Sequence, residues 1–230
     1  MPSSFDIIEE KRKRKGFVKL GLIDPDKKND INLVKIIKRI ERDKFDGILI
    51  GGSSISDSLF QNRVNKIVNN TSLPTILFPG SSNQICKNVS SILFLNLISG
   101  RNPKYLIDEQ VRGAAEIYKY KIEPIPTAYI LLDGGINASV SKISETLPLS
   151  MSNKDIILNH SLAGQYLGNK IIYFDCGSGA KKSIEPKLLK HIKNHINIPI
   201  MVGGGITTSA QIDELIDSGA SYIVCGTMFE

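Results

Sequence analysis

Apolar and amphipathic stretches alternate along the whole chain. Short runs that are apolar almost throughout occur at residues 17–23, 47–50, 75–78, 91–95, 128–132, 170–174, 198–202 and 222–225. Between them lie stretches with apolar residues at helical spacing, at residues 32–43, 57–69, 104–118, 154–167, 185–194 and 209–218. This alternation predicts parallel βα units, and the continuous apolar character of the runs predicts strands that are buried on both faces.

The number of βα units predicts a (β/α)8 TIM barrel formed as a single domain over residues 1–230. A doubly wound open sheet is the alternative, and it is disfavoured because no G-x-G-x-x-G motif follows the first strand. The helical segment at residues 81–87 is short, whereas the connection 133–150 is long and rich in Gly and Ser, as in lids and binding loops. After the last strand only residues 226–230 follow, so either the barrel closes without a final C-terminal helix or that helix lies beyond this sequence.

Composition narrows the class of protein. No apolar run approaches the roughly 20 residues that span a bilayer, and the N-terminal residues lack the apolar core of a signal peptide. The three cysteines, Cys86, Cys176 and Cys225, show neither metal-ligand nor disulfide spacing, which predicts a cytoplasmic protein. The net charge of +6 favours anionic partners. The basic run at residues 11–15 is interpreted as the solvated face of an N-terminal helix, since no nucleic-acid-binding module accompanies it.

Small and polar residues collect where the predicted strands end, which is the side of a TIM barrel that carries the active site. Glycine lets backbone N–H groups approach an anion closely, and a helix N-terminus behind such a loop adds a favourable dipole. Barrels commonly bind a phosphate between the loops after strands 7 and 8. We therefore predict a phosphate site from three segments: Gly203-Gly204-Gly205, Gly226-Thr227 and, on a third side, Gly177-Ser178-Gly179.

Two acidic residues follow the first strand. Asp24 and Asp26 offer the hard oxygen ligands that Mg²⁺ prefers, and Ser53 on the next strand end offers another. An Asp-Pro-Asp sequence is equally typical of an ordinary turn, so the pattern leaves both interpretations open. Cys176 is interpreted as a packing residue rather than a nucleophile, because the neighbouring carboxylate of Asp175 disfavours a thiolate.

Taken in order, the strand-end motifs resemble the geranylgeranylglyceryl phosphate synthase family, whose superfamily includes the bacterial heptaprenylglyceryl phosphate synthases. The form of the motif after the sixth strand is similar to the second of the family's two groups, group II. The motifs span nearly the whole chain and are Asp24-Pro25-Asp26-Lys27, Gly51-Gly52-Ser53, Phe78-Pro79-Gly80, Tyr173-Phe174-Asp175, Gly177-Ser178-Gly179-Ala180, Gly203-Gly204-Gly205-Ile206 and Gly226-Thr227.

The resemblance implies a Mg²⁺-dependent prenyltransferase of the phosphoglycerol geranylgeranyltransferase type. Such an enzyme joins the 3-hydroxyl of sn-glycerol 1-phosphate to a long-chain prenyl diphosphate, here expected to be geranylgeranyl diphosphate. The reaction forms an ether-lipid precursor and releases diphosphate. The resemblance also implies a homo-oligomer and peripheral membrane contact through the lipid product, with no nucleic-acid partner.

The family's residue roles carry over to matching positions of this chain. Asp24 and Ser53 match the positions that bind Mg²⁺ and hold the diphosphate. The glycerol phosphate site is matched by Tyr173, Phe174, Asp175, Cys176, Gly177, Ser178, Gly179, Gly203, Gly204, Gly205, Gly226 and Thr227. The attacking hydroxyl must lose a proton, which gives Asp175 the catalytic role of base. The family usually has Glu here, so transfer directly to Asp175 and transfer through a water both stay open.

Two other functions remain open at the level of sequence. A sugar-phosphate isomerase or synthase of amino-acid biosynthesis would use the same phosphate site, with Asp24 and Asp133 as its acid and base. A non-catalytic barrel that only binds a phosphate ligand would keep the glycine-rich loops and lose the chemistry. Activity without metal would favour the first alternative, and tight glycerol phosphate binding without turnover would favour the second.

Overall fold

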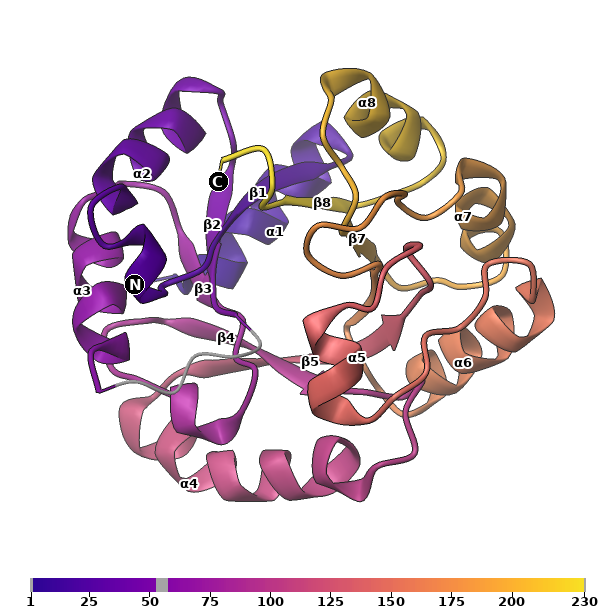
Figure 1. The fold of residues 1–230 in the computed structure, drawn as a ribbon, viewed down its shortest axis with the longest axis horizontal. Helices are drawn as coiled ribbons and strands as arrows, with labels where there is room; N and C mark the ends of the chain where they lie inside the picture. Colours follow the sequence, from indigo (N-terminus) through magenta and orange to yellow (C-terminus); the bar gives the residue numbers. More distant parts are fainter. Residues whose placement is uncertain (1, 53–57, 230) are drawn as a thin grey trace.

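A computed structural model describes residues 2–52 and 58–229, except for the side chain of Lys27. Within these residues, eight parallel strands form a closed barrel in the order in which they occur along the chain (Figure 1). Closure is made by β8 and β1, where Tyr222 lies opposite Val18. The strands are β1 Val18–Ile23, β2 Gly47–Ile50, β3 Thr75–Leu77, β4 Ser91–Asn96, β5 Glu123–Leu131, β6 Ile171–Asp175, β7 Ile200–Gly203 and β8 Tyr222–Cys225. The predicted TIM barrel is confirmed.

Helices surround the barrel, as Figure 1 shows. In α2 the buried residues Leu33, Ile36, Ile37 and Ile40 recur at helical spacing, so one face packs on the strands. The α-helices are α1 Ser4–Lys15, α2 Leu33–Arg42, α3 Phe60–Asn69, α4 Glu109–Tyr120, α5 Ser139–Ser144, α6 Lys154–Tyr166, α7 Pro186–Lys193 and α8 Ser209–Asp217. Three short helical turns complete the set: η1 Lys27–Asn29, η2 Ser82–Gln84 and the π-type turn η3 Lys104–Asp108. No helix in the described ranges is long and apolar enough to cross a membrane.

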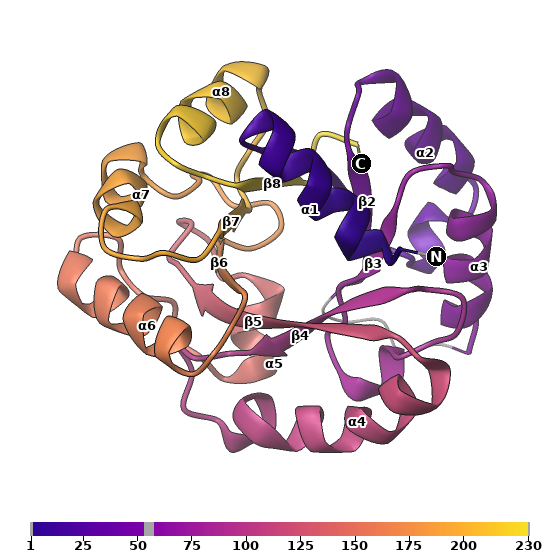
Figure 2. The same cartoon turned by 180° about the vertical axis from the view of Figure 1, so that it is seen from behind.

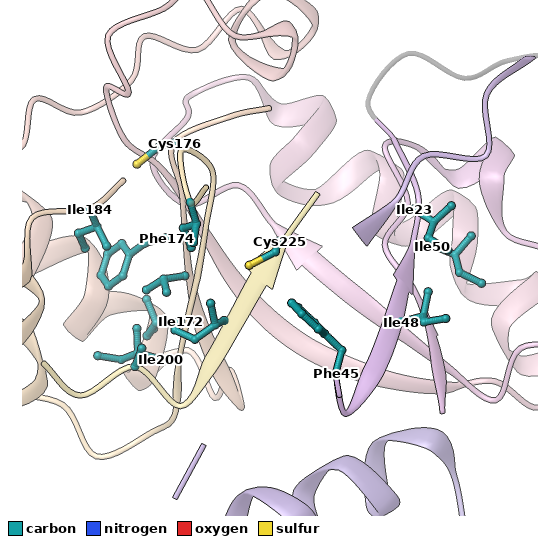
Figure 3. Close-up of a cluster of buried hydrophobic side chains, with 14 of the residues drawn as sticks. Ile23, Phe45, Ile48, Ile50, Ile172, Phe174, Cys176, Ile184, Ile200 and Cys225 are labelled. Carbon is teal, nitrogen blue, oxygen red and sulfur yellow. The ribbon is translucent and has the colours of Figure 1, made fainter. Parts of the chain in front are cut away.

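The strands separate two apolar cores. Successive side chains of a strand point to opposite faces of the sheet, and β6 shows this clearly. Ile172 and Phe174 belong to the core between strands and helices, as Figure 3 shows, whereas Ile171 and Tyr173 belong to the core inside the barrel. All four side chains are buried. The pleat of β6 therefore decides which of its residues can reach the interior of the barrel.

The N-terminal helix α1 closes the end of the barrel that is opposite the strand ends where chemistry is expected (Figure 2). Phe5 and Ile8 are buried against the interior core. The predicted basic helix is confirmed, but its run is not wholly solvated. Lys15 lies 2.5 Å from the Asp46 carboxylate, and Lys11 Nζ donates to the Asp46 carbonyl at 3.0 Å.

Strand β5 begins at Glu123, five residues before the predicted start at residue 128. The early part contains Pro124 and Pro126, which cannot donate backbone hydrogen bonds. It is held nevertheless, because Glu123 N donates to the Ser90 carbonyl at 2.8 Å and the Pro126 carbonyl accepts from Lys170 N at 2.8 Å. Neighbouring strands on both sides thus override the local preference.

The connections also differ in detail from the predictions. The long connection at 133–150, predicted as a loop, contains the short helix α5. The predicted short segment after β3 is confirmed, because only η2 stands where a barrel usually has a full helix. After β8 the described residues 226–229 form a turn, and Phe229 packs edge-to-face on Phe45 with ring centroids 5.1 Å apart.

Candidate active site

Asp175 lies at the end of β6, at the centre of the open end of the barrel. One of its carboxylate oxygens, Oδ1, accepts a hydrogen bond from Gly177 N at 2.7 Å. The other, Oδ2, accepts from the hydroxyl of Tyr129, which lies on the neighbouring strand β5. The two hydrogen bonds fix the plane of the carboxylate, and its accessible edge faces the groove that a substrate would enter.

The surroundings of Asp175 change its acidity. Burial raises the pKa of the Asp175 carboxyl above its ordinary value, because the charged form loses hydration. The hydrogen bonds from Tyr129 and Gly177 act in the opposite direction and lower that pKa in part. Since a general base works best when its pKa approaches the working pH, a raised value makes Asp175 a stronger base than an exposed aspartate.

Three aromatic rings pack beside this carboxylate. Phe78 lies 5.4 Å from Tyr173 and 6.1 Å from Tyr129 between ring centroids, and the two tyrosine rings lie 5.2 Å apart. Burial, with the nearby Asp175 charge, raises the pKa of both tyrosines well above the ordinary value, so both hydroxyls stay protonated. Tyr173 reaches its position because Gly203 has no side chain, since a Cβ there would lie 2.7 Å from the tyrosine oxygen.

The glycine-rich loops after β6 and β7 pack directly on each other. Gly204 has φ +80°, and a Cβ at this position would lie 2.7 Å from Gly177 N. Gly177 has φ +88° and lies against Ala138. Both positions therefore require glycine on conformational and steric grounds. The close approach leaves backbone groups rather than side chains facing the groove, as an anion site needs.

The structure brings most of the predicted glycerol phosphate residues together. The predicted residues that line the groove are Tyr173, Asp175, Gly177, Ser178, Gly204, Gly226 and Thr227. The helix N-terminus that was expected behind the phosphate loop does not line the groove among the described residues. Helix α8 starts at Ser209, and its first turn is occupied by a capping box in which Thr208 and Gln211 bond each other. The groove lining on this side therefore comes from the loops, including the hydroxyl-bearing residues Ser178 and Thr227.

Other predicted residues lie behind the groove wall. The side chains of Phe174 and Cys176 face the outer core and are almost fully buried, as Figure 3 shows, so only their backbones face the loops. Burial and the adjacent Asp175 raise the pKa of the Cys176 thiol, which agrees with its interpretation as a packing residue. Gly179, Gly203 and Gly205 shape the loops without lining the groove among the described residues.

Asp24 lies at the end of β1, on the rim opposite Asp175. Its carboxylate packs against Gly52, where a Cβ would overlap the oxygen Oδ1. Lys28 Nζ lies 3.8 Å from Asp24 Oδ2, and Asn29 Nδ2 donates a hydrogen bond to the Asp24 backbone carbonyl at 2.8 Å. Asp24 faces the groove as predicted, whereas the predicted metal ligand Ser53 lies outside the described residues.

The charged side chains that line the described part of the groove are all acidic. Its lining contains three carboxylates, those of Asp24, Glu109 and Asp175, and among the described residues it contains no lysine or arginine. The parts of the chain that the structure describes hold no cluster of three or more His, Cys, Asp or Glu side chains suited to a metal. One carboxylate beside a glycine cradle fits Mg²⁺, which commonly takes one or two protein carboxylates together with substrate phosphates.

From the polar rim the groove continues into an apolar arm between β4 and α4. The arm exists because η2 replaces a full helix after β3 and leaves this flank of β4 uncovered. Gly113 in α4 contributes to the space, since a Cβ there would lie 2.5 Å from Ile85 Cδ1. The arm is lined mainly by Ile85, Ile92, Leu93, Phe94, Leu95, Leu97, Gly113, Ile117, Val140 and Ile143.

Sequence reasoning missed three residues that build the site. Tyr129, which bonds Asp175, is the polar member of the otherwise apolar predicted run 128–132, and this is a signal that was available. Gln84 ties two rim loops, donating to the Gly52 carbonyl at 2.9 Å and accepting from Gly80 N at 2.8 Å. Glu109 accepts from Ser82 N at 2.6 Å and so holds η2 against α4. The sequence carries no pattern that predicts the last two contacts.

The alternative acid–base pair is not assembled. Asp133 is exposed, and its carboxylate accepts from Gly135 N at 2.8 Å in a local turn. It does not line the described part of the groove, whereas Asp24 does. Asp24 and Asp133 therefore do not face each other across the groove, as the predicted acid and base of such an isomerase would have to do.

The fold and the site together define a (β/α)8 barrel whose polar rim opens into an apolar groove. The chain belongs to the PcrB family, whose model matches residues 5–230. Geranylgeranylglyceryl phosphate synthase of Flavobacterium johnsoniae is 38% identical over 97% of this chain and 92% of the relative. The enzyme of the same name from Pyrococcus furiosus is 37% identical over 97% of this chain and 88% of its own length.

Solved structures agree with this assignment. The crystal structure of (S)-3-O-geranylgeranylglyceryl phosphate synthase from Thermoplasma acidophilum, in complex with substrate sn-glycerol-1-phosphate, superposes with a TM-score of 0.91 at 31% identity, covering 100% of this chain and 92% of that chain. An N-acetylmannosamine-6-phosphate 2-epimerase from Clostridium perfringens shares the fold alone, with a TM-score of 0.56 at 12% identity over 92% of this chain and 87% of that chain. The predicted family and its prenyltransferase class are confirmed.

Proposed function

We propose that this chain transfers a long-chain prenyl group, geranylgeranyl by preference, from its diphosphate to the 3-hydroxyl of sn-glycerol 1-phosphate. The observation that carries the proposal is the continuous groove. At one end backbone groups of glycine-rich loops face a small polar pocket, and at the other an apolar arm runs between β4 and α4. Few substrates other than a phosphorylated polyol and a prenyl chain match both ends at once.

A bound Mg²⁺ would offset the charge conflict of the groove. The diphosphate is strongly anionic, yet the groove wall carries carboxylates and no cationic side chain among the described residues. Asp24, beside the Gly52 cradle, would hold the ion, with Ser53 as the second protein ligand expected from the family motif. When bound, the metal neutralises the diphosphate and makes it a better leaving group.

Asp175 acts as the base in this proposal. The bond between the allylic carbon and the diphosphate oxygen breaks, and the oxygen of the glycerol hydroxyl forms the new bond to that carbon. The hydroxyl proton passes to Asp175, whose carboxylate is held by Tyr129 and Gly177. The shorter Asp side chain is compensated by these two donors, because they fix its position beside the loop that would bind the phosphate.

Two further parts of the proposal concern the protein as a whole. A homo-oligomer is supported by large apolar side chains on the outer helices, with Tyr118 on α4 87% exposed and Tyr166 on α6 77% exposed. A cytoplasmic location is consistent with the three cysteines, which are buried and free.

A defined assay tests the function. Purified protein is incubated with sn-glycerol 1-phosphate, MgCl₂ and prenyl diphosphates of graded length, and the ether product is followed by mass spectrometry. We expect product with the geranylgeranyl donor, loss of product with excess EDTA, and its recovery when Mg²⁺ is restored. Absence of ether product with every donor length, from protein that stays folded by circular dichroism, would refute the proposal.

A further inference from the structure

Apolar side chains are exposed on the segments that flank the outer end of the apolar arm. Leu147 is 87% exposed, Ile107 is 58% exposed and Ile143 is 40% exposed. They come from the loop after α5, from η3 and from α5. We call these three residues, together with the exposed cations Arg101, Lys104 and Lys142, the mouth patch. Exposed apolar groups that gather at one place usually mark a surface that binds something.

Hydrogen bonds hold the segments of the mouth patch side by side. The Tyr105 hydroxyl donates to the Ile143 carbonyl at 3.1 Å, and Asn102 Nδ2 donates to the Ser144 carbonyl at 3.4 Å. Figure 1 accordingly shows α5 close to the start of α4. Residues from two connections that are far apart in sequence therefore form one surface on the open side of the barrel.

The mouth patch is continuous with the groove. Ile143 is both exposed and part of the groove lining, and Tyr105 beside it also lines the groove. An apolar chain that lies in the arm would therefore reach the protein surface beside these two residues. A prenyl chain that entered the groove from bulk water would be exposed to water at this end. A surface that covered the patch would exclude that water.

The residues of the mouth patch and its surroundings carry a net positive charge. Arg101, Lys104 and Lys142 are exposed, and within the described residues none of the three forms an ion pair with a carboxylate. Two acidic residues, Asp108 and Glu145, lie among them. Positive charge therefore exceeds negative charge here, and cations that flank exposed apolar groups suit the anionic headgroups of a bilayer.

We propose that the mouth patch docks this protein on an anionic lipid bilayer, so that prenyl chains pass directly between the bilayer and the groove. The inference rests on the proposed function, because only a lipid-like substrate and product need such a passage. The apolar residues would enter the interface of the bilayer while the cations contact its headgroups. The reaction would thereby take its donor from the membrane and return the ether product to it.

A second copy of the chain is a poorer occupant of the same surface. In a two-fold interface the same patch meets itself, so two surfaces that each carry an excess of positive charge would be brought together. A partner seated there would also cover the exit of the groove beside Ile143. Both features favour a lipid surface over self-association at this place.

Vesicle sedimentation tests the proposal. Full-length protein is mixed with vesicles of phosphatidylcholine alone or of phosphatidylcholine with phosphatidylglycerol, at low and high salt. We expect binding to the anionic vesicles that weakens with salt. Leu147→Asp, Ile107→Asp and the double variant Lys104→Glu/Lys142→Glu should each reduce the bound fraction about tenfold or more, since each basic residue near the surface contributes to attraction.

Matched controls separate this surface from others. Ile31 is 90% exposed on the loop before α2, far around the barrel, so Ile31→Asp makes the same kind of change elsewhere. Lys13→Glu/Arg14→Glu reverses two exposed charges on α1, at the closed end. Both controls should bind vesicles like the parent protein.

Three outcomes would overturn the proposal. The first is parent protein that ignores anionic vesicles, and the second is patch variants that bind as well as the controls. The third is patch variants that instead dissociate an oligomer in size-exclusion chromatography, which would assign the surface to a subunit contact. Turnover with a short, water-soluble prenyl diphosphate is measured in parallel. It should be unchanged in the patch variants, and its absence in the parent protein would count against the proposed function alone.

Discussion

The polar rim at β6–β8 and the apolar arm at β4–α4 are made in different ways. At the rim the walls are backbone, held so closely that Gly204 has no room for a Cβ beside Gly177. In the arm the walls are side chains, and the space exists because a helix is replaced by the single turn η2. The rim is thus formed by backbone segments in close contact, and the arm by the absence of a full helix after β3.

This difference has a consequence for specificity. Backbone donors at fixed positions suit one small anion and tolerate almost no change, since any added atom meets other backbone. Side chains around a gap can be exchanged one at a time, so the arm can be shortened or lengthened while the barrel stays intact. In the proposed function the rim would therefore set which acceptor reacts, and the arm would set which donor length fits.

The largest expected effect comes from Asp24→Ala, at the end of β1 on the groove lining. A metal that neutralises the leaving group contributes several kcal/mol, so activity should fall at least about a hundredfold. The variant should keep its far-ultraviolet circular dichroism and its melting temperature. Asp26→Ala, a change of the same kind two residues away, should retain most activity. Full activity in Asp24→Ala would remove Asp24 from the metal site.

The rim can be broken at Gly204. Gly204→Ala places a Cβ 2.7 Å from Gly177 N and adds the strain of φ +80°, which together should cost about 1–3 kcal/mol of stability and raise the KM for glycerol phosphate more than tenfold. Gly168→Ala is the matched control, because Gly168 has φ +85° and nothing within 4 Å. The control should lose stability while its KM stays constant. Equal kinetics in both variants would show that the loop contact does not shape the acceptor site.

The arm can be shortened at Gly113. Gly113→Leu projects into the arm toward Ile85, and each CH₂ of the donor that loses its place costs about 0.8 kcal/mol. We expect the donor preference to move from geranylgeranyl to a shorter chain, measured as kcat/KM for donors of graded length. Ala114→Leu, on the exposed face one residue further, should leave the preference unchanged. An unchanged preference in Gly113→Leu would place the prenyl chain elsewhere.

The smallest expected effect is that of Tyr129→Phe, which sharpens the role of the rim. The hydrogen bond from Tyr129 lowers the pKa of Asp175, so its removal raises that pKa. The ionised base then appears only at higher pH, and the acidic limb of the pH–rate profile should move upward, with kcat reduced about tenfold. Tyr222→Phe removes another buried hydroxyl, bonded to Glu9 at the closed end, and should leave the limb in place. If the acidic limb of the pH–rate profile does not move in Tyr129→Phe, the group that titrates in that limb is not Asp175.

The barrel and the acceptor loops were predictable because their signals are local. Continuous apolar runs mark buried parallel strands, and glycines at their ends mark loops where backbone must come close. Strand β5 was predicted to start too late, since Pro124 and Pro126 oppose strand formation locally and only the neighbouring strands reveal why they are tolerated. Family motifs alone placed Phe174 and Cys176 at the site. The alternation of the pleat places their side chains behind it.

The apolar arm could not have been predicted in the same way. It is lined by residues from β4, α4 and the segment after β3, which come together only in the closed barrel. The arm depends on the short connection between β3 and β4, which contains only η2. The length of this connection in the sequence does not predict which residues line the space beside β4. The bond between Tyr129 and Asp175 likewise depends on the register in which Leu131 lies opposite Asp175.

The closing of the barrel by α1 sets an order for its assembly. Ser3 bonds Glu123 at 2.5 Å, Phe5 N bonds the Ser91 hydroxyl at 3.1 Å, and Glu9 receives the hydroxyl of Tyr222. The ribosome makes this helix before any of those partners, so Phe5 has no buried site during most of synthesis. This helix, which is made before its partners, can therefore take its native place only after β4, β5 and β8 are available, and its apolar face needs protection until then.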